Sequence, residues 1–393
     1  MKKTVRDVDV SGKRVLMRCD FNVPLDEQGR IRDARRIESS LPTIRYVAER
    51  GGRVILTSHL GRPKGRDQKL TLRPVAEALT RLLAKPVPLL PDCVGPEVES
   101  AVAAMRDGDV VLLENVRFYP EEEKNDPEFA RKLARLGDMY VSDAFATAHR
   151  ANASTEGVAH LLHPAVAGLL MEKELTVLGG ALASPQRPFA ALLGGAKISD
   201  KIPVIENLLE KVDALLIGGG MAFTFLKAKG YEVGKSLLDK EKIALAADLM
   251  ARAQRRGVAL ELPRDVVVGA ALEDDTPVRV VSADKIPADQ MGADIGPETR
   301  KAFAQVITQA KTVIWNGPVG AFEWKPFAAG TRAMAEALAK SSATTIIGGG
   351  ETAEAVEKMG FAEKMTHVST GGGASLEFLE GKVLPGVAVL EDK

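Results

Sequence analysis

Cysteine and long apolar runs are scarce in this chain of 393 residues. Cys19 and Cys93 are the only two cysteines, so no disulfide framework is expected and a reducing compartment fits better. No stretch reaches the ~18 uninterrupted apolar residues of a membrane-spanning helix. The N-terminal segment MKKTVRDVDV also lacks the apolar core of an export signal. We therefore expect a cytoplasmic protein with no membrane partner.

An excess of either charge is also missing, because Lys+Arg and Asp+Glu both number 53. This balance argues against a protein held by a broad basic field on nucleic acid. The composition, 45% hydrophobic and 27% charged, excludes disorder and fibrous repeats. Single cores stop growing near ~250–300 residues, so the length predicts two domains.

Short β-branched or Leu-rich runs alternate with longer segments of helical period, which is typical of βα units on parallel sheets. Strands are predicted at residues 14–18, 53–57, 87–90, 110–113, 139–142, 189–193, 214–217, 266–268, 312–315, 344–347 and 366–368. Helices are predicted between them, for example at 37–50 and 72–83. The economical fold is α/β, with two doubly wound parallel-sheet (Rossmann-like) domains.

A helical stretch at 170–182, ended by the turn-forming Ser184-Pro185, is the predicted connector between the domains. It divides the chain into a first domain at 1–169, a connecting helix at 170–184 and a second domain that starts at 185. Arginine exceeds lysine before this connector, and lysine exceeds arginine after it. Arginine offers a planar donor fork suited to phosphate and carboxylate, whereas lysine is a movable point charge.

In an open parallel sheet, ligands bind beyond the carboxyl ends of the strands. In the first half, the segments after the strands carry cations and an imidazole, namely Arg36, His59, Arg62, Arg117 and Arg150. Together these side chains predict a site for a small, multiply charged anion. Each arginine alone is more often a solvated surface residue, and His59 could equally be a hydrogen-bonded structural histidine.

In the second half, the strands end in glycine pairs or triplets instead. They lie at 194–195, 218–220, 348–350 and 371–373, with Gly317 after a further strand. Glycines there let backbone N–H groups and a helix N-terminus approach a phosphate, although tight-turn geometry alone would explain any one of them. Lys197 and Lys201 would share one face if a helix starts beside them. We expect a nucleotide site here.

The glycines are compatible with three classes of protein: a phosphoryl-transfer enzyme, a dehydrogenase and a non-enzymatic anion receptor. No GxxxxGK[ST] occurs, so the loop is not a Walker-type P-loop. Residues 348–353 satisfy the dinucleotide-binding pattern GxGxxA only formally, and a dehydrogenase is therefore the alternative. A non-enzymatic anion receptor would bind without turnover. No catalytic base stands out, and a carboxylate acceptor needs none because it is already ionised at pH 7. Phosphoryl transfer would then rest on cations, backbone amides and Mg²⁺.

The motifs along the chain resemble those of the phosphoglycerate kinase family, in family order. They are RCDFNVPL, SHLGRPKG, LENVRFYPEE, SDAFATAHRANAST, LLGGAKISDKI, IGGGMAFTFL, VIWNGPVGAFE, IIGGGETAEA and STGGGASLEFLEGKVLPGV. The resemblance implies reversible transfer of the acyl phosphate of 1,3-bisphosphoglycerate to ADP with Mg²⁺, giving 3-phosphoglycerate and ATP, in glycolysis and gluconeogenesis. It also favours a monomer. Because the two sites lie in separate domains and their ligands must meet, we expect a hinge at the connecting helix and the returning C-terminal segment. The family's last segment, here 371–393, returns to the first domain.

The resemblance implies two sets of site residues. The substrate set, in the 3-phosphoglycerate domain, is Asp20, Asn22, Arg36, His59, Leu60, Gly61, Arg62, Arg117 and Arg150. The nucleotide set, expected within 185–370, is Gly194, Gly195, Lys197, Lys201, Gly218, Gly219, Asn316, Pro318, Glu323, Gly349, Gly350, Glu351 and Thr352. The residues implied at the transferring phosphoryl group are Arg36, Lys197, Gly349 and Gly372.

One position departs from the family pattern. Glu351 stands where the family has an aspartate as the Mg²⁺ ligand. A carboxylate is kept, but its reach grows by one methylene, and Mg²⁺ demands near-ideal octahedral geometry. Glu351 is therefore the predicted metal ligand, with altered coordination.

Overall fold

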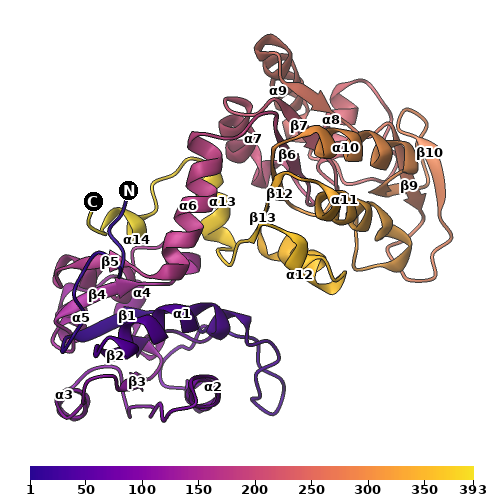
Figure 1. The fold of residues 1–393 in the computed structure, drawn as a ribbon. Coiled ribbons are helices and arrows are strands. Elements are labelled where there is room, and N and C mark those ends of the chain that lie inside the picture. The colour runs from indigo at the N-terminus through magenta and orange to yellow at the C-terminus, as the bar shows by residue number, and fades with distance from the viewer. The chain divides into compact units, whose positions relative to one another are not determined.

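The computed structural model describes residues 1–393, which divide into two units (Figure 1). Unit 1 comprises Met1–Thr176 and Val383–Lys393, and unit 2 comprises Val177–Lys382. The helix α6, Leu169–Ala183, carries the chain from one unit to the other. Across both units, helices fall short of the length and apolar character needed to cross a membrane.

The sheet of unit 1 is wholly parallel, with the strand order β3-β2-β1-β4-β5. Its strands are β1 Arg14–Arg18, β2 Arg53–Thr57, β3 Val110–Leu112, β4 Met139–Ser142 and β5 Ala165–Ala167. Because all the carboxyl ends meet at one edge, the segments that follow these strands lie close together.

Helices cover both faces of this sheet, as the predicted doubly wound fold requires. They are α1 Arg35–Glu49, α2 Arg73–Leu83, α3 Pro96–Ala103, α4 Pro120–Glu123 and α5 Pro127–Ala134. One core joins α1 and α2 to the alternate strand residues Val15, Met17 and Val54. Leu16 and Ile55 alternate with them along the strands and are also fully buried.

The C-terminal segment completes unit 1. It contains α14, Pro385–Ala388, where the Gly386 amide donates to the Ala148 carbonyl at 2.8 Å. The Lys3 amide donates to the Glu391 carbonyl at 2.8 Å, so the two chain termini lie side by side (Figure 1). This segment therefore packs beside the residues that follow β4.

The main sheet of unit 2 is also parallel, in the order β14-β13-β12-β6-β7-β8. Its strands are β6 Phe189–Leu193, β7 Ala214–Ile217, β8 Ala259–Glu261, β12 Thr312–Asn316, β13 Thr344–Gly348 and β14 His367–Val368. The helices are α7 Ile202–Leu209, α8 Ala222–Ala228, α9 Ile243–Arg256, α10 Pro297–Gln309, α11 Ala329–Lys340, α12 Gly350–Lys358 and α13 Gly373–Leu379. A buried core built around Trp315 joins α10, α11 and α12 to this sheet. The predicted fold class, two doubly wound parallel sheets joined by one helix, is confirmed.

Two strand predictions need correction. Residues 266–268 do form a strand, β9 Asp265–Gly269, but it lies in a separate antiparallel sheet with β10 Arg279–Ser282 and β11 Met291–Ile295. Residues 87–90 do not form a strand, because only Leu89 makes an isolated bridge to Leu112. Prolines at 86, 88 and 91 interrupt any longer ladder, since proline has no backbone N–H to donate.

Candidate functional site

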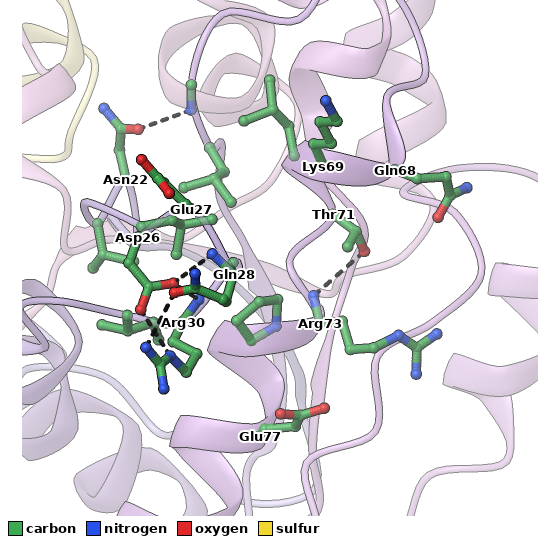
Figure 2. Close-up of a pocket in the computed structure, with 18 of the residues that line it drawn as sticks. Asn22, Asp26, Glu27, Gln28, Arg30, Gln68, Lys69, Thr71, Arg73 and Glu77 are labelled. Atoms are coloured by element: carbon green, nitrogen blue, oxygen red, sulfur yellow. Dashed lines mark hydrogen bonds and ion pairs between the residues drawn. The ribbon is translucent and has the colours of Figure 1, made fainter.

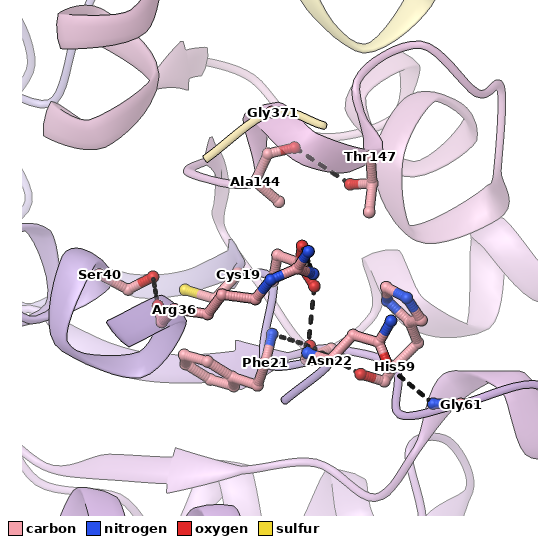
Figure 3. Close-up of polar contacts among 12 residues, drawn as sticks. Cys19, Phe21, Asn22, Arg36, Ser40, His59, Gly61, Ala144, Thr147 and Gly371 are labelled. Carbon is pink, nitrogen blue, oxygen red and sulfur yellow. Dashed lines mark hydrogen bonds and ion pairs between the residues drawn. The ribbon is translucent and has the colours of Figure 1, made fainter. Parts of the chain in front are cut away.

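The first candidate site lies at the carboxyl edge of the unit 1 sheet (Figure 3). Asp20 follows β1, and its carboxylate accepts a hydrogen bond from Arg36, in the first turn of α1, at 2.5 Å. The Asp20 side chain is 9% exposed and that of Arg36 is 38% exposed. Asp20 therefore fixes the guanidinium of Arg36 while leaving part of it open to a ligand.

Asn22 and Arg117 hold the loop that follows β2. The Asn22 side-chain oxygen accepts from the Gly61 amide at 2.8 Å, and Arg117 donates to the Gly61 carbonyl at 2.9 Å. Gly61 has φ +64, and an added Cβ would lie 2.9 Å from a methyl carbon of Leu70. A glycine is favoured here mainly by the positive φ, since any other side chain would strain the backbone and would also require Leu70 to shift. These two hydrogen bonds join the segments that follow β1, β2 and β3.

His59 lies within this arrangement and is 4% exposed. Burial lowers the pKa of His59 well below its usual value, and the cations Arg18, Arg117, Arg36 and Arg150 lower it further. Buried imidazoles near several cations resist protonation because the charged form is poorly solvated and repelled. His59 is therefore a neutral group among arginines.

The remaining predicted substrate residues are placed as follows. Leu60 is buried, whereas Arg62 is exposed on the loop after β2. Arg150 is exposed and donates from Nε to the neighbouring His149 at 3.2 Å. Arg117 is held by Glu123 at 3.2 Å, and burial lowers the pKa of its guanidinium. The cationic side chains thus come from loops that follow different strands, and those of Arg62 and Arg150 are exposed.

Arg18, the last residue of β1, was missed by the sequence reasoning. It is 2% exposed, and its Nη2 donates to His59 Nδ1 at 3.1 Å. The available signal was its position directly before Cys19 and Asp20 at a strand end. Its burial could not be read from the sequence, because an arginine ending a strand is more often solvated.

A cavity of about 1040 Å³ adjoins this site (Figure 2). Asn22, Leu60 and Gly61 line part of it. The rest carries charges of both signs, including Asp26 and Arg30, which are paired at 2.7 Å. The positive and negative side chains that line the cavity are nearly equal in number. The cavity is therefore not a second cluster of cationic side chains.

In unit 2, several of the predicted glycines serve loop packing. An added Cβ on Gly194 would lie 2.2 Å from the Pro318 carbonyl oxygen, and one on Gly219 would lie 2.6 Å from the Gly195 amide nitrogen. Gly219 also has φ +66. The loops after β6, β7 and β12 therefore touch backbone to backbone, which explains the glycines at 194 and 219 without a ligand.

The glycines at the start of α12 differ from those in the packed loops. Gly349 is the N-cap, with φ +89, and an added Cβ on Gly350 would meet nothing within 4 Å. Asn316, the last residue of β12, lies beside them, since a Cβ on Gly349 would be 3.2 Å from Asn316 Nδ2. That buried Nδ2 has no hydrogen-bond partner. A helix N-terminus with open space and an unused donor is suited to an anion.

Lys201 brings a cation to the same place, because its Nζ donates to Asn316 Oδ1. Burial lowers the pKa of Lys201, and the nearby Glu351 opposes this shift. Lys197 is exposed and caps a short 3₁₀ helix, Ile198–Asp200, while α7 starts only after Lys201. The two lysines therefore do not share the face of one helix, since the chain turns between them.

The acidic and hydroxyl residues around α12 have separate positions. Glu351 is exposed in the first turn of α12. Thr352 is buried, and its hydroxyl oxygen accepts from the Gly317 amide at 2.7 Å, so it holds the loop after β12. Glu323 is exposed on the turn after β12. Gly372, the N-cap of α13, has φ +51 and open space around its Cβ position.

Comparisons with known proteins agree along the whole chain. A family model described as phosphoglycerate kinase matches residues 5–382. Phosphoglycerate kinases of Pelotomaculum thermopropionicum and Dictyoglomus turgidum are 62% and 58% identical to this chain, with 100% of each chain covered. The match thus extends over the full length of both relatives.

Solved structures agree as well. A phosphoglycerate kinase from Coxiella burnetii superposes with a TM-score of 0.92 at 44% identity, covering 99% of this chain and 98% of that chain. One from Pyrococcus horikoshii gives a TM-score of 0.82 at 32% identity, with the same coverage.

Proposed function

The chain belongs to the phosphoglycerate kinase family, and we propose which of its residues bind each substrate and which act on the transferring group. The enzyme is a phosphotransferase of glycolysis, which moves a phosphoryl group between 1,3-bisphosphoglycerate and ADP. Family membership sets aside the dehydrogenase and the anion receptor. We assign 3-phosphoglycerate to unit 1 and the nucleotide to unit 2, with α6 as the hinge between them.

The arginines of unit 1 support the assignment of 3-phosphoglycerate. This substrate carries a carboxylate and a phosphate, which contributes about −1.5 to −2 charges at neutral pH. Arg36, Arg62, Arg117 and Arg150 supply cationic forks that pair well with both groups. Asn22 and His59 add uncharged polar groups that orient the ligand.

The unpartnered Nδ2 of Asn316 is the observation that carries the nucleotide assignment. A buried donor without a partner costs free energy, about 1–3 kcal/mol, so it points to a ligand that supplies an acceptor. The open start of α12 and the ammonium group of Lys201 lie at the same position. Nucleotide phosphates offer acceptor oxygens and the negative charge that both features favour.

Phosphoryl transfer then needs no general base from the protein. A carboxylate oxygen of 3-phosphoglycerate attacks the γ-phosphorus of ATP, and the bond from that phosphorus to the bridging oxygen breaks as ADP leaves. Arg36 and Lys197 are assigned to the charge on the transferring group, and the amides at Gly349 and Gly372 to its oxygens. Binding of both substrates positions the reacting atoms and excludes water.

The Glu351 carboxylate fits a Mg²⁺ ion bound with the nucleotide. Mg²⁺ is commonly held by one or two carboxylates together with substrate phosphates and water. Glu351 is exposed beside the proposed phosphate position, so it is free to take part. The ion would neutralise phosphate charge during transfer. Lys201 and Asn316 would hold the same phosphates from the protein side.

Calorimetric titration of two variants tests this division. Arg36→Ala should weaken binding of 3-phosphoglycerate and leave MgADP binding unchanged, because only the unit 1 site is altered. Lys201→Ala should do the opposite. The exposed Arg45 and Lys229 provide matched control substitutions in units 1 and 2. The division is wrong if either variant loses the ligand assigned to the other unit.

Location and oligomeric state are proposed from the same activity. A glycolytic substrate favours the cytoplasm, and the thiols of Cys19 and Cys93 are both free and buried. We propose a monomer, since both sites are built from one chain. Sedimentation equilibrium of the purified protein measures this directly, and a mass above that of one 42.0 kDa chain would contradict it.

A further inference from the structure

Arg18 is tied to His59 through a buried guanidinium whose three nitrogens each donate to a protein acceptor. Nη2 donates to His59 Nδ1 at 3.1 Å, Nε donates to Ser154 Oγ at 2.8 Å, and Nη1 donates to the Cys19 carbonyl. Arg18 is only 2% exposed. Its donors are thus directed into the protein, unlike those of the exposed arginines nearby.

The contact with Arg18 fixes which nitrogen of His59 carries the proton. A guanidinium has donors and no acceptor, so Nδ1 must accept the hydrogen bond and cannot carry hydrogen itself. A neutral imidazole with a bare Nδ1 carries its proton on Nε2. A second proton on Nδ1 would point at a cation, so this contact also opposes the charged ring.

Ser154 and Glu122 hold Arg18 in place from the other side. Ser154 Oγ accepts from Arg18 and donates to Glu122 Oε1 at 2.5 Å, while the Ser154 amide donates to Glu122 Oε2 at 2.9 Å. Glu122 is 2% exposed. A buried cation is retained only when paired, and this carboxylate is the matching charge.

The charged groups around His59 act in the same direction. Arg18 comes from β1, Arg36 from α1, Arg117 from the segment after β3, and Arg150 from the segment after β4. Arg36 and Arg117 pair directly with the carboxylates of Asp20 and Glu123. Arg18 instead reaches the Glu122 carboxylate through Ser154. Burial and all four cations lower the pKa of His59.

We propose that Arg18 is a positioning residue that holds His59 as the neutral Nε2–H tautomer, so that His59 gives 3-phosphoglycerate an uncharged donor that does not titrate. Arg18 Nη2 then donates a hydrogen bond to His59 Nδ1, and His59 Nε2 donates one to the bound anion. The last step rests on the proposed binding of 3-phosphoglycerate in unit 1. The tautomer itself rests only on the Arg18 contact.

Long-range ¹H–¹⁵N correlation spectra of the ¹⁵N-labelled full chain test the tautomer without any ligand. The His59 signals are identified among those of the five histidines by their loss in His59→Gln. We expect a bare Nδ1 and a protonated Nε2 that do not shift between about pH 6 and pH 8, the range in which an ordinary histidine titrates. A proton on Nδ1, or titration near the ordinary value of about 6.5, would overturn the proposal.

Arg18→Met tests the link to the substrate. His59 should then exchange between its two neutral tautomers, and KM for 3-phosphoglycerate should rise by ~10-fold with a smaller change in kcat. Burial and the three remaining arginines still lower the pKa of His59, so the variant changes the tautomer and not the charge of the ring. An unchanged KM, or a variant in which His59 keeps only the Nε2–H tautomer, would count against the role of Arg18.

Two further variants keep the test decisive. If Arg18→Met does not fold, Ser154→Ala loosens the guanidinium while keeping its charge, and partial exchange between tautomers is expected. Arg45→Met, at an exposed arginine of α1, should leave the spectra and KM unchanged. A parent that shows the Nε2–H tautomer but no calorimetric binding of 3-phosphoglycerate would refute the proposed function and leave the tautomer inference standing.

Discussion

Replacing Asp143 with asparagine should remove a pH dependence from the stability of unit 1. Asp143 follows β4 and is fully buried, and its Oδ1 accepts from the amides of Leu170 at 2.9 Å and Met171 at 3.2 Å, in the first turn of α6. Its Oδ2 has no partner. Burial raises the pKa of Asp143 from 3.8 to about 7, although Thr43 and the two amides oppose the shift.

The sign of the effect follows from this raised pKa. Folding takes up a proton at Asp143 between the unfolded and the folded values, so its contribution is full at low pH and is lost as pH rises through about 7. At about pH 5.5 the folded pKa is some 1.5 units away, and each unit is worth about 1.36 kcal/mol. The proton thus stabilises the fold by roughly 2 kcal/mol at that pH and by almost nothing at about pH 8.

Urea unfolding of the parent and of Asp143→Asn, followed by circular dichroism at both pH values, measures this difference. An asparagine oxygen still accepts from both amides and does not titrate. Relative to the parent, the variant should therefore gain roughly 2 kcal/mol on going from about pH 5.5 to about pH 8. Burial also raises the pKa of Asp294 in unit 2 to about 7, but this acts equally on both proteins and cancels. Equal pH slopes for parent and variant would show that Asp143 does not titrate with a raised pKa in the folded protein.

Three predictions concern the reaction itself. Arg36→Lys should lower kcat by ~10²-fold with a smaller change in KM, because the planar fork is lost, and a rise in KM alone in steady-state kinetics would contradict this. Glu351→Gln should weaken MgADP binding and raise the Mg²⁺ requirement. The control Glu354→Gln, at an exposed ion pair with Lys358, should change neither. If Glu351→Gln and the parent give equal Mg²⁺ titrations, Glu351 is not the ligand. Gly349→Ala should weaken MgADP binding more than Gly360→Ala. Both glycines have positive φ, but only an added Cβ at 349 would lie beside Asn316. If calorimetry shows equal losses of MgADP affinity in the two variants, backbone strain alone explains the effect.

Most of the parallel sheet could be predicted from the sequence. Residues 14–18 and 53–57 match β1 and β2 because uninterrupted apolar runs are typical of strands buried on both faces. β5, with two alanines in three residues, and the half-exposed β8 were missed because neither carries that signal. The returning segment was predicted to start at 371, and residues 371–382 lie in unit 2.

The chemistry of the sites was harder to predict than the residues that form them. Glycine at 194 and at 349 looks alike in the sequence, yet one is packed against the Pro318 carbonyl and the other borders open space. A glycine that packs against another loop can be distinguished from one that borders a ligand site only when the positions of the distant loops are known. Arg18 likewise reaches Glu122 only through Ser154, and these residues come from distant segments, so no local sequence pattern predicts a buried arginine.

ATP formation by the purified chain from 1,3-bisphosphoglycerate and MgADP tests whether the two proposed sites together transfer a phosphoryl group. We expect continuous turnover in the parent, followed with an enzyme that consumes ATP. We expect at least ~10²-fold slower turnover in Arg36→Ala and in Lys197→Ala. The parent binding both ligands without forming ATP, or either variant retaining full turnover, would contradict this proposal.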